Sequence, residues 1–223
     1  MGKRIIVVFL SILSIVLYSG CSSTINLDYC FNCVFSLICS EESRFDSIGT
    51  AFAISENRLV TNAHVVSYFE DGQKILFSKI IIKPYNSNEE VELKVEFVDF
   101  SKDYAILNYA DTNYKAKNYL KIGDSDKLKI GEKIGTIGNL NNYGLCYNEG
   151  ILSSYKKTIL NNGTYNDYYQ TNIEISKGSS GGPVLNSKNE VVGIMTFKLR
   201  DTNSEYVDGM SFFLPIENVE LNH

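Results

Sequence analysis

Short stretches rich in apolar and β-branched residues run through most of the chain, separated by polar clusters of turn-forming residues. Residues 48–54, 59–61, 74–83 and 91–100 each carry such a stretch, and another begins at Asp103, where Ala105 and Leu107 alternate with Tyr104 and Ile106. Such stretches are typical of strands, and no window holds a helical period over three turns. This part of the chain is therefore predicted to be a series of short strands.

A second series of strands follows the polar stretch at residues 111–118, which we take as the link between two halves. About six strands in each half, all with short connections, fit two small antiparallel barrels better than one sandwich. The predicted fold is all-β, with a six-stranded antiparallel β-barrel over residues 46–118, another over residues 119–223 and a cleft between them. The strands expected in the second half are residues 133–137, 150–155, 168–175, 183–186, 190–197 and 210–214.

The N-terminal residues depart from this strand pattern. Lys3 and Arg4 precede an apolar run at residues 5–17, and small residues follow it. A membrane-spanning helix needs about 20 residues, so the short run fits a signal peptide over residues 1–20 better than a transmembrane helix. The protein is therefore expected to leave the cytosol.

The end of this signal carries a cysteine. Residues 18–21 read Tyr-Ser-Gly-Cys and resemble the lipobox of bacterial lipoproteins, although a lipobox usually has leucine at the position of Tyr18. Cys21 is accordingly the expected lipidation site, which would anchor the mature protein to a membrane of the bacterial cell envelope. An ordinary signal peptide, which would leave a soluble secreted or periplasmic protein, is the alternative.

Further cysteines follow within the segment 21–45. Cys30, Cys33 and Cys39 lie close together, whereas Cys146 is far away in the sequence. In an oxidising compartment this spacing favours local disulfides without fixing their pairing. A redox or metal site is disfavoured, because no βαβ pattern follows the Cys-x-x-Cys pair and the chain has only 2 histidines. Residues 21–45 are therefore predicted to be a tether between the anchor and the folded part.

Composition adds few constraints. The 223 residues are 44% hydrophobic and 21% charged, which is ordinary for a globular protein, and 15 tyrosines and 12 phenylalanines favour strands. The formal net charge is −5, and removal of Lys3 and Arg4 with the signal would make it −7. This negative charge argues against nucleic acid as a partner.

The most informative stretch is residues 178–183, which read Gly-Ser-Ser-Gly-Gly-Pro. The glycines allow a sharp turn that aims two amides at one point, as an oxyanion hole requires. A serine nucleophile also needs a base, and His64 is the candidate because His223 is the last residue. A carboxylate must then orient the imidazole. Asp103 follows a polar corner and is preferred to Asp99, which lies inside the preceding strand.

Each feature alone has a simpler structural interpretation: a buried histidine, an aspartate in a turn, a glycine-rich loop. Together they run along the chain as His64, Asp103 and Ser180, which is one of the convergent orders in which these catalytic groups occur. The shared order favours catalysis over three independent structural roles.

The sequence resembles trypsin-like serine proteases, and within them the HtrA-like bacterial branch, over about residues 49–218. Three segments carry most of the likeness: residues 60–66 (Val-Thr-Asn-Ala-His-Val-Val), residues 103–107 (Asp-Tyr-Ala-Ile-Leu) and residues 178–184. Shorter matches lie at residues 49–52, 137–139, 149–153, 171–172, 192–196 and 210–215.

This resemblance implies a double β-barrel serine endopeptidase that hydrolyses protein or peptide substrates through an acyl-enzyme, without a metal or cofactor. Carried over by position, His64 would be the general base, Asp103 its partner and Ser180 the nucleophile. The backbone N–H groups of Gly178 and Ser180 would form the oxyanion hole. Ser179 departs from the pattern, which usually has Asp or Asn there, and no PDZ domain is expected in this chain.

The resemblance also implies a substrate pocket walled by Glu174, Thr196, Phe197 and Lys198. Glu174 at its base would favour a lysine or arginine side chain of the substrate. Alternatively, Lys198 could neutralise Glu174, or Glu174 could lie on the solvent face of its strand.

Two other functions fit parts of the sequence. One is a catalytically silent lipoprotein that keeps the protease fold and acts as a binding or adhesion module. The other is an esterase, but its usual Gly-x-Ser-x-Gly elbow, with the serine before the histidine, is absent.

Overall fold

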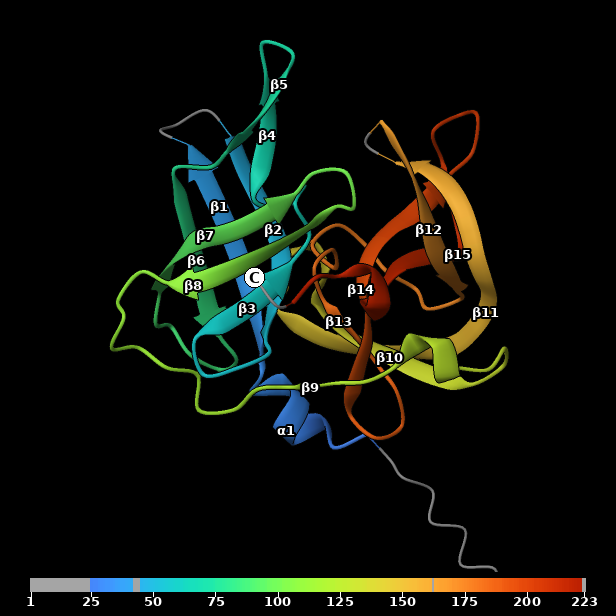
Figure 1. The fold of residues 1–223 in the computed structure, drawn as a ribbon, viewed down its shortest axis with the longest axis horizontal. Helices are drawn as coiled ribbons and strands as arrows, with labels where there is room; N and C mark the ends of the chain where they lie inside the picture. The colour runs from blue at the N-terminus through green and yellow to red at the C-terminus, as the bar shows by residue number, and fades with distance from the viewer. Residues whose placement is uncertain (1–24, 42–44, 162, 222–223) are drawn as a thin grey trace, which may run out of the picture.

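The computed structural model describes residues 25–41, 45–161 and 163–221, which form two β-rich halves side by side (Figure 1). The predicted signal peptide and Cys21 lie outside the described residues. No helix in these three ranges is long and apolar enough to cross a membrane.

The first half is a closed barrel whose strands follow the order β1-β2-β3-β8-β7-β6. Every neighbouring pair in this barrel is antiparallel. Leu37, Leu59, Ile82 and Leu107 point from different strands into its core and are fully buried. The strands are β1 (Val34–Glu41), β2 (Phe45–Ala53), β3 (Arg58–Thr61), β6 (Lys79–Pro84), β7 (Val91–Asp99) and β8 (Tyr104–Tyr109). The prediction of a first six-stranded barrel is confirmed.

Two strand predictions in this half need correction. The strand expected at residues 74–83 is two strands in different sheets: β5 (Gln73–Leu76) pairs with β4 (Ser67–Glu70) in a hairpin that projects from the barrel, and β6 follows it (Figure 1). The tether expected at residues 21–45 is also wrong from residue 34 onward, because β1 pairs with both β2 and β6.

The second half is a seven-stranded sheet with the order β13-β10-β11-β12-β15-β14-β9. β13 also pairs with β14, so the sheet curls back on itself, and β9 lies parallel to β14 at the end of the order. Its strands are β9 (Lys121–Ile122), β10 (Lys133–Asn139), β11 (Leu145–Asn161), β12 (Thr164–Thr171), β13 (Pro183–Leu185), β14 (Glu190–Arg200) and β15 (Tyr206–Pro215). The all-β prediction is confirmed.

Helical turns are few and short in the described residues. They are α1 (Leu27–Phe31) and the 3-10 turns Ser125–Lys127, Leu140–Asn142 and Ile216–Asn218. The turn Leu140–Asn142 follows β10 directly and lies beside the glycine-rich loop, as described below.

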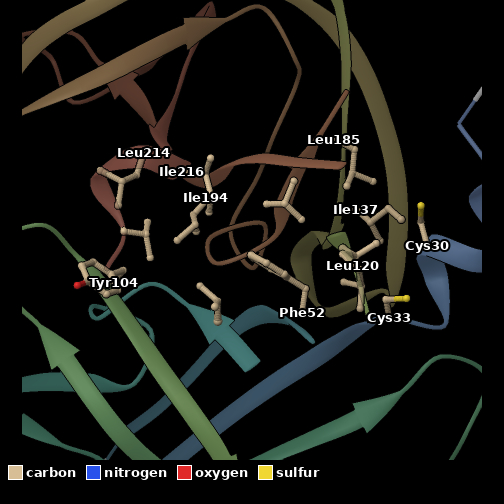
Figure 2. Close-up of a cluster of buried hydrophobic side chains, with 14 of the residues drawn as sticks. Cys30, Cys33, Phe52, Tyr104, Leu120, Ile137, Leu185, Ile194, Leu214 and Ile216 are labelled. Carbon is tan, nitrogen blue, oxygen red and sulfur yellow. The ribbon is translucent and has the colours of Figure 1, made fainter. Parts of the chain in front are cut away.

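One apolar cluster joins the two halves. It combines Phe52 and Tyr104 of the first barrel with Ile137 and Ile194 of the second sheet, all fully buried (Figure 2). Burial of apolar surface stabilises by roughly 25 cal/mol per Å², so these side chains hold the halves in a fixed relation. Any group placed between the halves is thereby positioned by both.

The cysteines do not form the expected local disulfides. Cys30, Cys33 and Cys39 are buried free thiols, and Cys146 is a free thiol at intermediate exposure. Cys30 and Cys33 belong to the cluster between the halves (Figure 2). Cys39 belongs to the core of the first barrel, so the thiols occupy different cores. Burial raises the pKa of Cys30 to about 11 and that of Cys39 to about 12, which keeps both thiols protonated.

Candidate active site

His64 lies just beyond β3, in a tight turn of the first barrel. The backbone N–H of Val65 donates to the Asn62 carbonyl and that of Val66 to the Ala63 carbonyl, at 3.2 Å each. The side chains of Val65 and Val66 are buried and anchor the turn in the barrel core. The histidine side chain remains 36% exposed and faces the cleft.

Asp103 immediately precedes β8 and has a left-handed backbone, with φ +64°. Aspartate tolerates this conformation better than most residues. Its N–H donates to the Asp99 carbonyl at 2.9 Å, and the Asp99 carboxylate caps the same turn by accepting from the N–H groups of Ser101 and Lys102. Asp99 therefore shapes the corner, while Asp103 is free to face His64.

Both carboxylate oxygens of Asp103 contact His64. Oδ2 lies 2.8 Å from the imidazole Nδ1, and Oδ1 accepts the backbone N–H of His64 at 2.9 Å. Burial lowers the pKa of His64, but the charge of Asp103 and the hydrogen bond to it outweigh this and raise the pKa above its ordinary value of 6.5. The positive charge of Lys74 partly opposes the increase.

Ser180 comes from the loop between β12 and β13 of the second half. It lines the same cleft of about 340 Å³ as His64 and Gly178. Its hydroxyl donates to the Thr196 carbonyl at 2.8 Å. Within the described residues it makes no hydrogen bond with His64, so the two side chains line one cleft without a hydrogen bond between them.

Gly178 adopts φ +94°, a conformation that side-chain-bearing residues rarely take. A Cβ at this position would lie 2.0 Å from the Asn139 carbonyl oxygen. The preceding carbonyl, of Lys177, accepts the N–H of Asn141 at 2.7 Å. In a planar trans peptide the N–H points opposite to the carbonyl, so the N–H of Gly178 points away from Asn141.

Ser179, the residue that departs from the family pattern, is fully buried. Its hydroxyl accepts the N–H of Ser176 at 3.2 Å, and its own N–H donates to the Ser176 carbonyl at 3.0 Å. A small neutral side chain therefore closes the turn before the predicted nucleophile. Gly138 packs against it, because a Cβ at Gly138 would lie 3.0 Å from the Cα of Ser179.

Asn62 is a site residue that the sequence interpretation missed. It is fully buried, and its side-chain N–H donates to the Asp103 carbonyl at 2.8 Å while its Oδ1 accepts the N–H of Gly181 at 2.7 Å. One amide thus connects the acid segment to the glycine-rich loop. In the sequence, the position of Asn62 two residues before His64 is the signal that could have identified it. Its two partners, Asp103 and Gly181, are distant in sequence.

The predicted pocket residues separate into two groups. Thr196, Phe197 and Lys198 line the cleft, whereas Glu174 does not and is 58% exposed at its side chain. The Lys198 ammonium binds the carboxylates of Glu174 at 2.7 Å and Asp208 at 2.9 Å. Hydrogen bonds to these two carboxylates raise the pKa of Lys198, so it stays charged.

In the part of the chain that the structure describes, no three His, Cys, Asp or Glu side chains gather into a group that could hold a metal ion. The arrangement instead brings an oriented imidazole, a hydroxyl and a glycine amide to one cleft between two packed halves. Such a set of groups is suited to nucleophilic acyl transfer.

Known proteins are similar to this chain over most of its length. The model of the trypsin-like peptidase domain matches residues 49–194. The probable periplasmic serine endoprotease DegP-like of Pseudomonas putida is 36% identical over 172 residues, which is 77% of this chain and 33% of that protein. The probable serine protease do-like of Buchnera aphidicola is 29% identical over 182 residues, 81% of this chain and 35% of that protein. The chain thus spans about a third of the length of these relatives.

Solved structures show the same likeness. The HtrA-type protease AlgW with tripeptide superposes with a TM-score of 0.71 and 26% identity, covering 86% of this chain and 58% of that one. A second structure of the same protease, with decapeptide, gives a TM-score of 0.68 at 23% identity, covering 86% of this chain and 63% of that one.

Proposed function

Because the chain belongs to the trypsin-like peptidase family, we propose that it is a serine endopeptidase that cleaves protein or peptide substrates in the cleft between its two halves. The observation that carries this proposal is the His64–Asp103 pair, at 2.8 Å, facing the same cleft as Ser180. The serine endoproteases among its relatives support the same activity.

The first chemical step needs a free imidazole nitrogen. Asp103 holds the Nδ1–H of His64, which leaves Nε2 unprotonated and able to accept a proton. The Ser180 hydroxyl rotates about χ1 from the Thr196 carbonyl toward Nε2, gives up its proton and attacks the substrate carbonyl carbon. The N–H groups of Gly178 and Ser180 then stabilise the oxyanion that forms.

The second step releases the amine. His64, now an imidazolium whose charge is offset by Asp103, donates its proton to the leaving nitrogen and the C–N bond breaks. A water molecule then gives a proton to His64 as its oxygen attacks the acyl-enzyme ester. The ester C–O bond to Ser180 breaks, His64 returns the proton to the Ser180 oxygen, and the carboxylic acid product leaves and ionises in solvent. The histidine thus alternates between base and acid, and the atoms balance without any cofactor.

In this proposal the second sheet serves as the second barrel of a double-barrel protease, a role supported by the additional β13–β14 pairing. Residues 46–118 and 119–223 would then be its two halves, with β1 completing the first. Each half would contribute one side of the active site. The apolar cluster between the halves supports this arrangement, because it holds the two sides together.

The substrate pocket is proposed to be walled by Thr196, Phe197 and Lys198, with Glu174 at its rim. Because Lys198 binds the Glu174 carboxylate, Glu174 is not available to pair with a basic substrate side chain. This arrangement supports a pocket that does not select lysine or arginine.

Export is also part of the proposal. Residues 1–20 would direct the chain out of the cytosol and Cys21 would carry the lipid, which places the protease at the bacterial cell envelope. The apolar run after Lys3 and Arg4 and the periplasmic relatives support export, and the Ser-Gly-Cys end supports lipidation.

A fluorophosphonate probe tests the enzyme against the binding-module alternative. We expect the folded wild type to be labelled at Ser180, and we expect labelling and β-casein cleavage to disappear in Ser180→Ala. Ser187→Ala, in the turn after β13, is the matched control and should keep both signals. A folded wild type that neither reacts with the probe nor cleaves casein would instead support a silent binding module.

A further inference from the structure

The glycine-rich loop of the second half is held by a single residue of the first barrel. Thr50, on β2, is fully buried. Its hydroxyl donates to the Gly178 carbonyl at 2.7 Å, and its backbone N–H donates to the Ser180 carbonyl at 2.9 Å. Two groups of one residue therefore fix the carbonyls of both residues whose amides are proposed to form the oxyanion hole.

The Thr50 hydroxyl is itself locked in orientation. A hydroxyl has one proton to donate, and here Gly178 receives it, while the lone pairs accept the N–H of Asn139 at 2.9 Å. The Thr50 carbonyl accepts the Thr61 hydroxyl at 2.7 Å. The N–H, the C=O and the hydroxyl of Thr50 therefore all have hydrogen-bond partners, which hold its side chain in one rotamer.

The geometry of the loop shows what these contacts control. The peptide that carries the Ser180 N–H lies between the two carbonyls fixed by Thr50. On the other side, Asn141 holds the Lys177 carbonyl at 2.7 Å, which orients the N–H of Gly178. The contacts of Ser179 are local and longer: 3.2 Å from its hydroxyl and 3.0 Å from its N–H to Ser176, and 3.1 Å from its carbonyl to the N–H of Gly182. The strongest contacts on the loop therefore come from outside it.

We propose that Thr50 is a positioning residue for the oxyanion hole, acting from the first barrel on backbone amides of the second half. This inference rests on the proposed peptidase function. It assigns Thr50 no contact with the substrate: removing its hydroxyl would let the Gly178–Ser179 peptide turn, and this peptide joins the two peptides that carry the Gly178 and Ser180 N–H groups. Misplacement of about 1 Å in such a site can cost about 100-fold in rate.

The variant Thr50→Val tests this, because valine keeps the side-chain volume and removes the hydroxyl. We expect kcat to fall about 10- to 100-fold, with KM changed less than about twofold, since the oxyanion forms only after substrate binds. Rates are measured on a fluorogenic peptide built from a site cleaved in β-casein. Thr50→Ser restores the hydroxyl and should return kcat to within about threefold of wild type.

Thr171→Val is the matched control. Thr171 is equally buried, and its hydroxyl also donates to a carbonyl, of Ile151 at 2.8 Å, and accepts a backbone N–H, of Ile173 at 3.2 Å. Neither partner belongs to residues 178–180. Both valine variants should lower the melting temperature by a similar amount, whereas only Thr50→Val should lower kcat. If Thr50→Val does not fold, Thr50→Ala carries the same expectation.

Three results would overturn the inference: equal kcat for Thr50→Val and Thr171→Val, a loss confined to KM, or no recovery in Thr50→Ser. In each case the wild type would still cleave casein and react with the fluorophosphonate probe, so the proposed function would stand. A folded but unreactive wild type would overturn the proposed function and this inference together.

Discussion

The proposed acid–base arm of the site, His64 and Asp103, is joined within one barrel by hydrogen bonds to the Asp103 carboxylate. The proposed nucleophile arm, residues 178–180, is held through its own backbone carbonyls and N–H groups by residues of both halves. Asp103 contacts the imidazole at 2.8 Å and is almost completely buried. On the nucleophile arm, the Gly178 carbonyl is bound by the Thr50 hydroxyl at 2.7 Å.

The comparison shows that substitutions in the two arms should reduce activity for different physical reasons. A carboxylate that orients an imidazole acts through its charge and its acceptor geometry, so an uncharged amide of the same shape disables it. A backbone amide that stabilises an oxyanion acts through direction alone, so an added methyl group is enough to misdirect it. Two substitutions and one pH profile separate these two kinds of dependence, and their expected effects differ in size.

The largest effect is expected for Asp103→Asn on the acid–base arm. The variant keeps the shape of the residue but loses the charge and can favour the wrong tautomer of His64, so kcat should fall about 10⁴-fold. Steady-state hydrolysis of the casein-derived peptide measures it. Asp99→Asn is the matched control, because Asp99 only caps the preceding turn, and its kcat should stay within about threefold. Comparable losses in both variants would refute the assignment of Asp103.

A smaller effect is expected for Gly178→Ala on the nucleophile arm. The new Cβ would lie 2.0 Å from the Asn139 carbonyl oxygen, so the loop must shift and kcat should fall about 10²- to 10³-fold. Gly131→Ala is the control, because Gly131 has a similar positive φ of +85° but no atom within 4 Å of the new Cβ. If Gly131→Ala lost as much activity, backbone strain rather than the loop position would explain the result.

The smallest effect is a shift in pH dependence, which should appear on the acid–base arm alone. His64 acts as a base only when neutral, and its pKa lies above 6.5, so the acid limb of the kcat/KM profile should have its midpoint above that value. NMR titration of the imidazole should give the same pKa. The midpoint should drop in Asp103→Asn and stay in Gly178→Ala; a shift in the glycine variant would show that the arms are not separate.

The same pKa direction has a consequence for stability. Because the folded-state pKa of His64 is raised, protonation favours the folded state, and this contribution is fully present below the unfolded pKa of about 6.5. It is lost as the pH rises through the folded-state pKa. Asp103→Asn should remove this pH dependence of the melting temperature.

Much of the fold could be predicted from short apolar stretches between polar turns, because strands such as β3 and β8 are buried along most of their length. The prediction failed at β1, where closely spaced cysteines suggested a tether although Leu37 and Cys39 point into the barrel. It failed again at residues 74–83, since apolar residues stand on both sides of the short break between β5 and β6. A pattern of burial does not reveal which sheet a strand joins.

The candidate site divides in the same way. His64, Asp103 and Ser180 could be proposed from the sequence because each lies in a local motif whose residue type suits one chemical role. Asn62 and Thr50 could not, because their roles arise from partners more than 100 residues away, Gly181 for one and Gly178 for the other. Such contacts exist only once the two halves have packed together.

The position of β1 also sets where this chain can be cut. The family likeness begins at residue 49, inside β2, and a fragment trimmed to that boundary would discard β1 and part of its neighbour. The barrel would then open along β6, leaving a row of unpaired N–H and C=O groups. Exposed edges of this kind recruit strands from other molecules, so the trimmed fragment should aggregate rather than fold. We therefore expect a fragment that folds to begin before Val34, well upstream of the region that the family likeness marks.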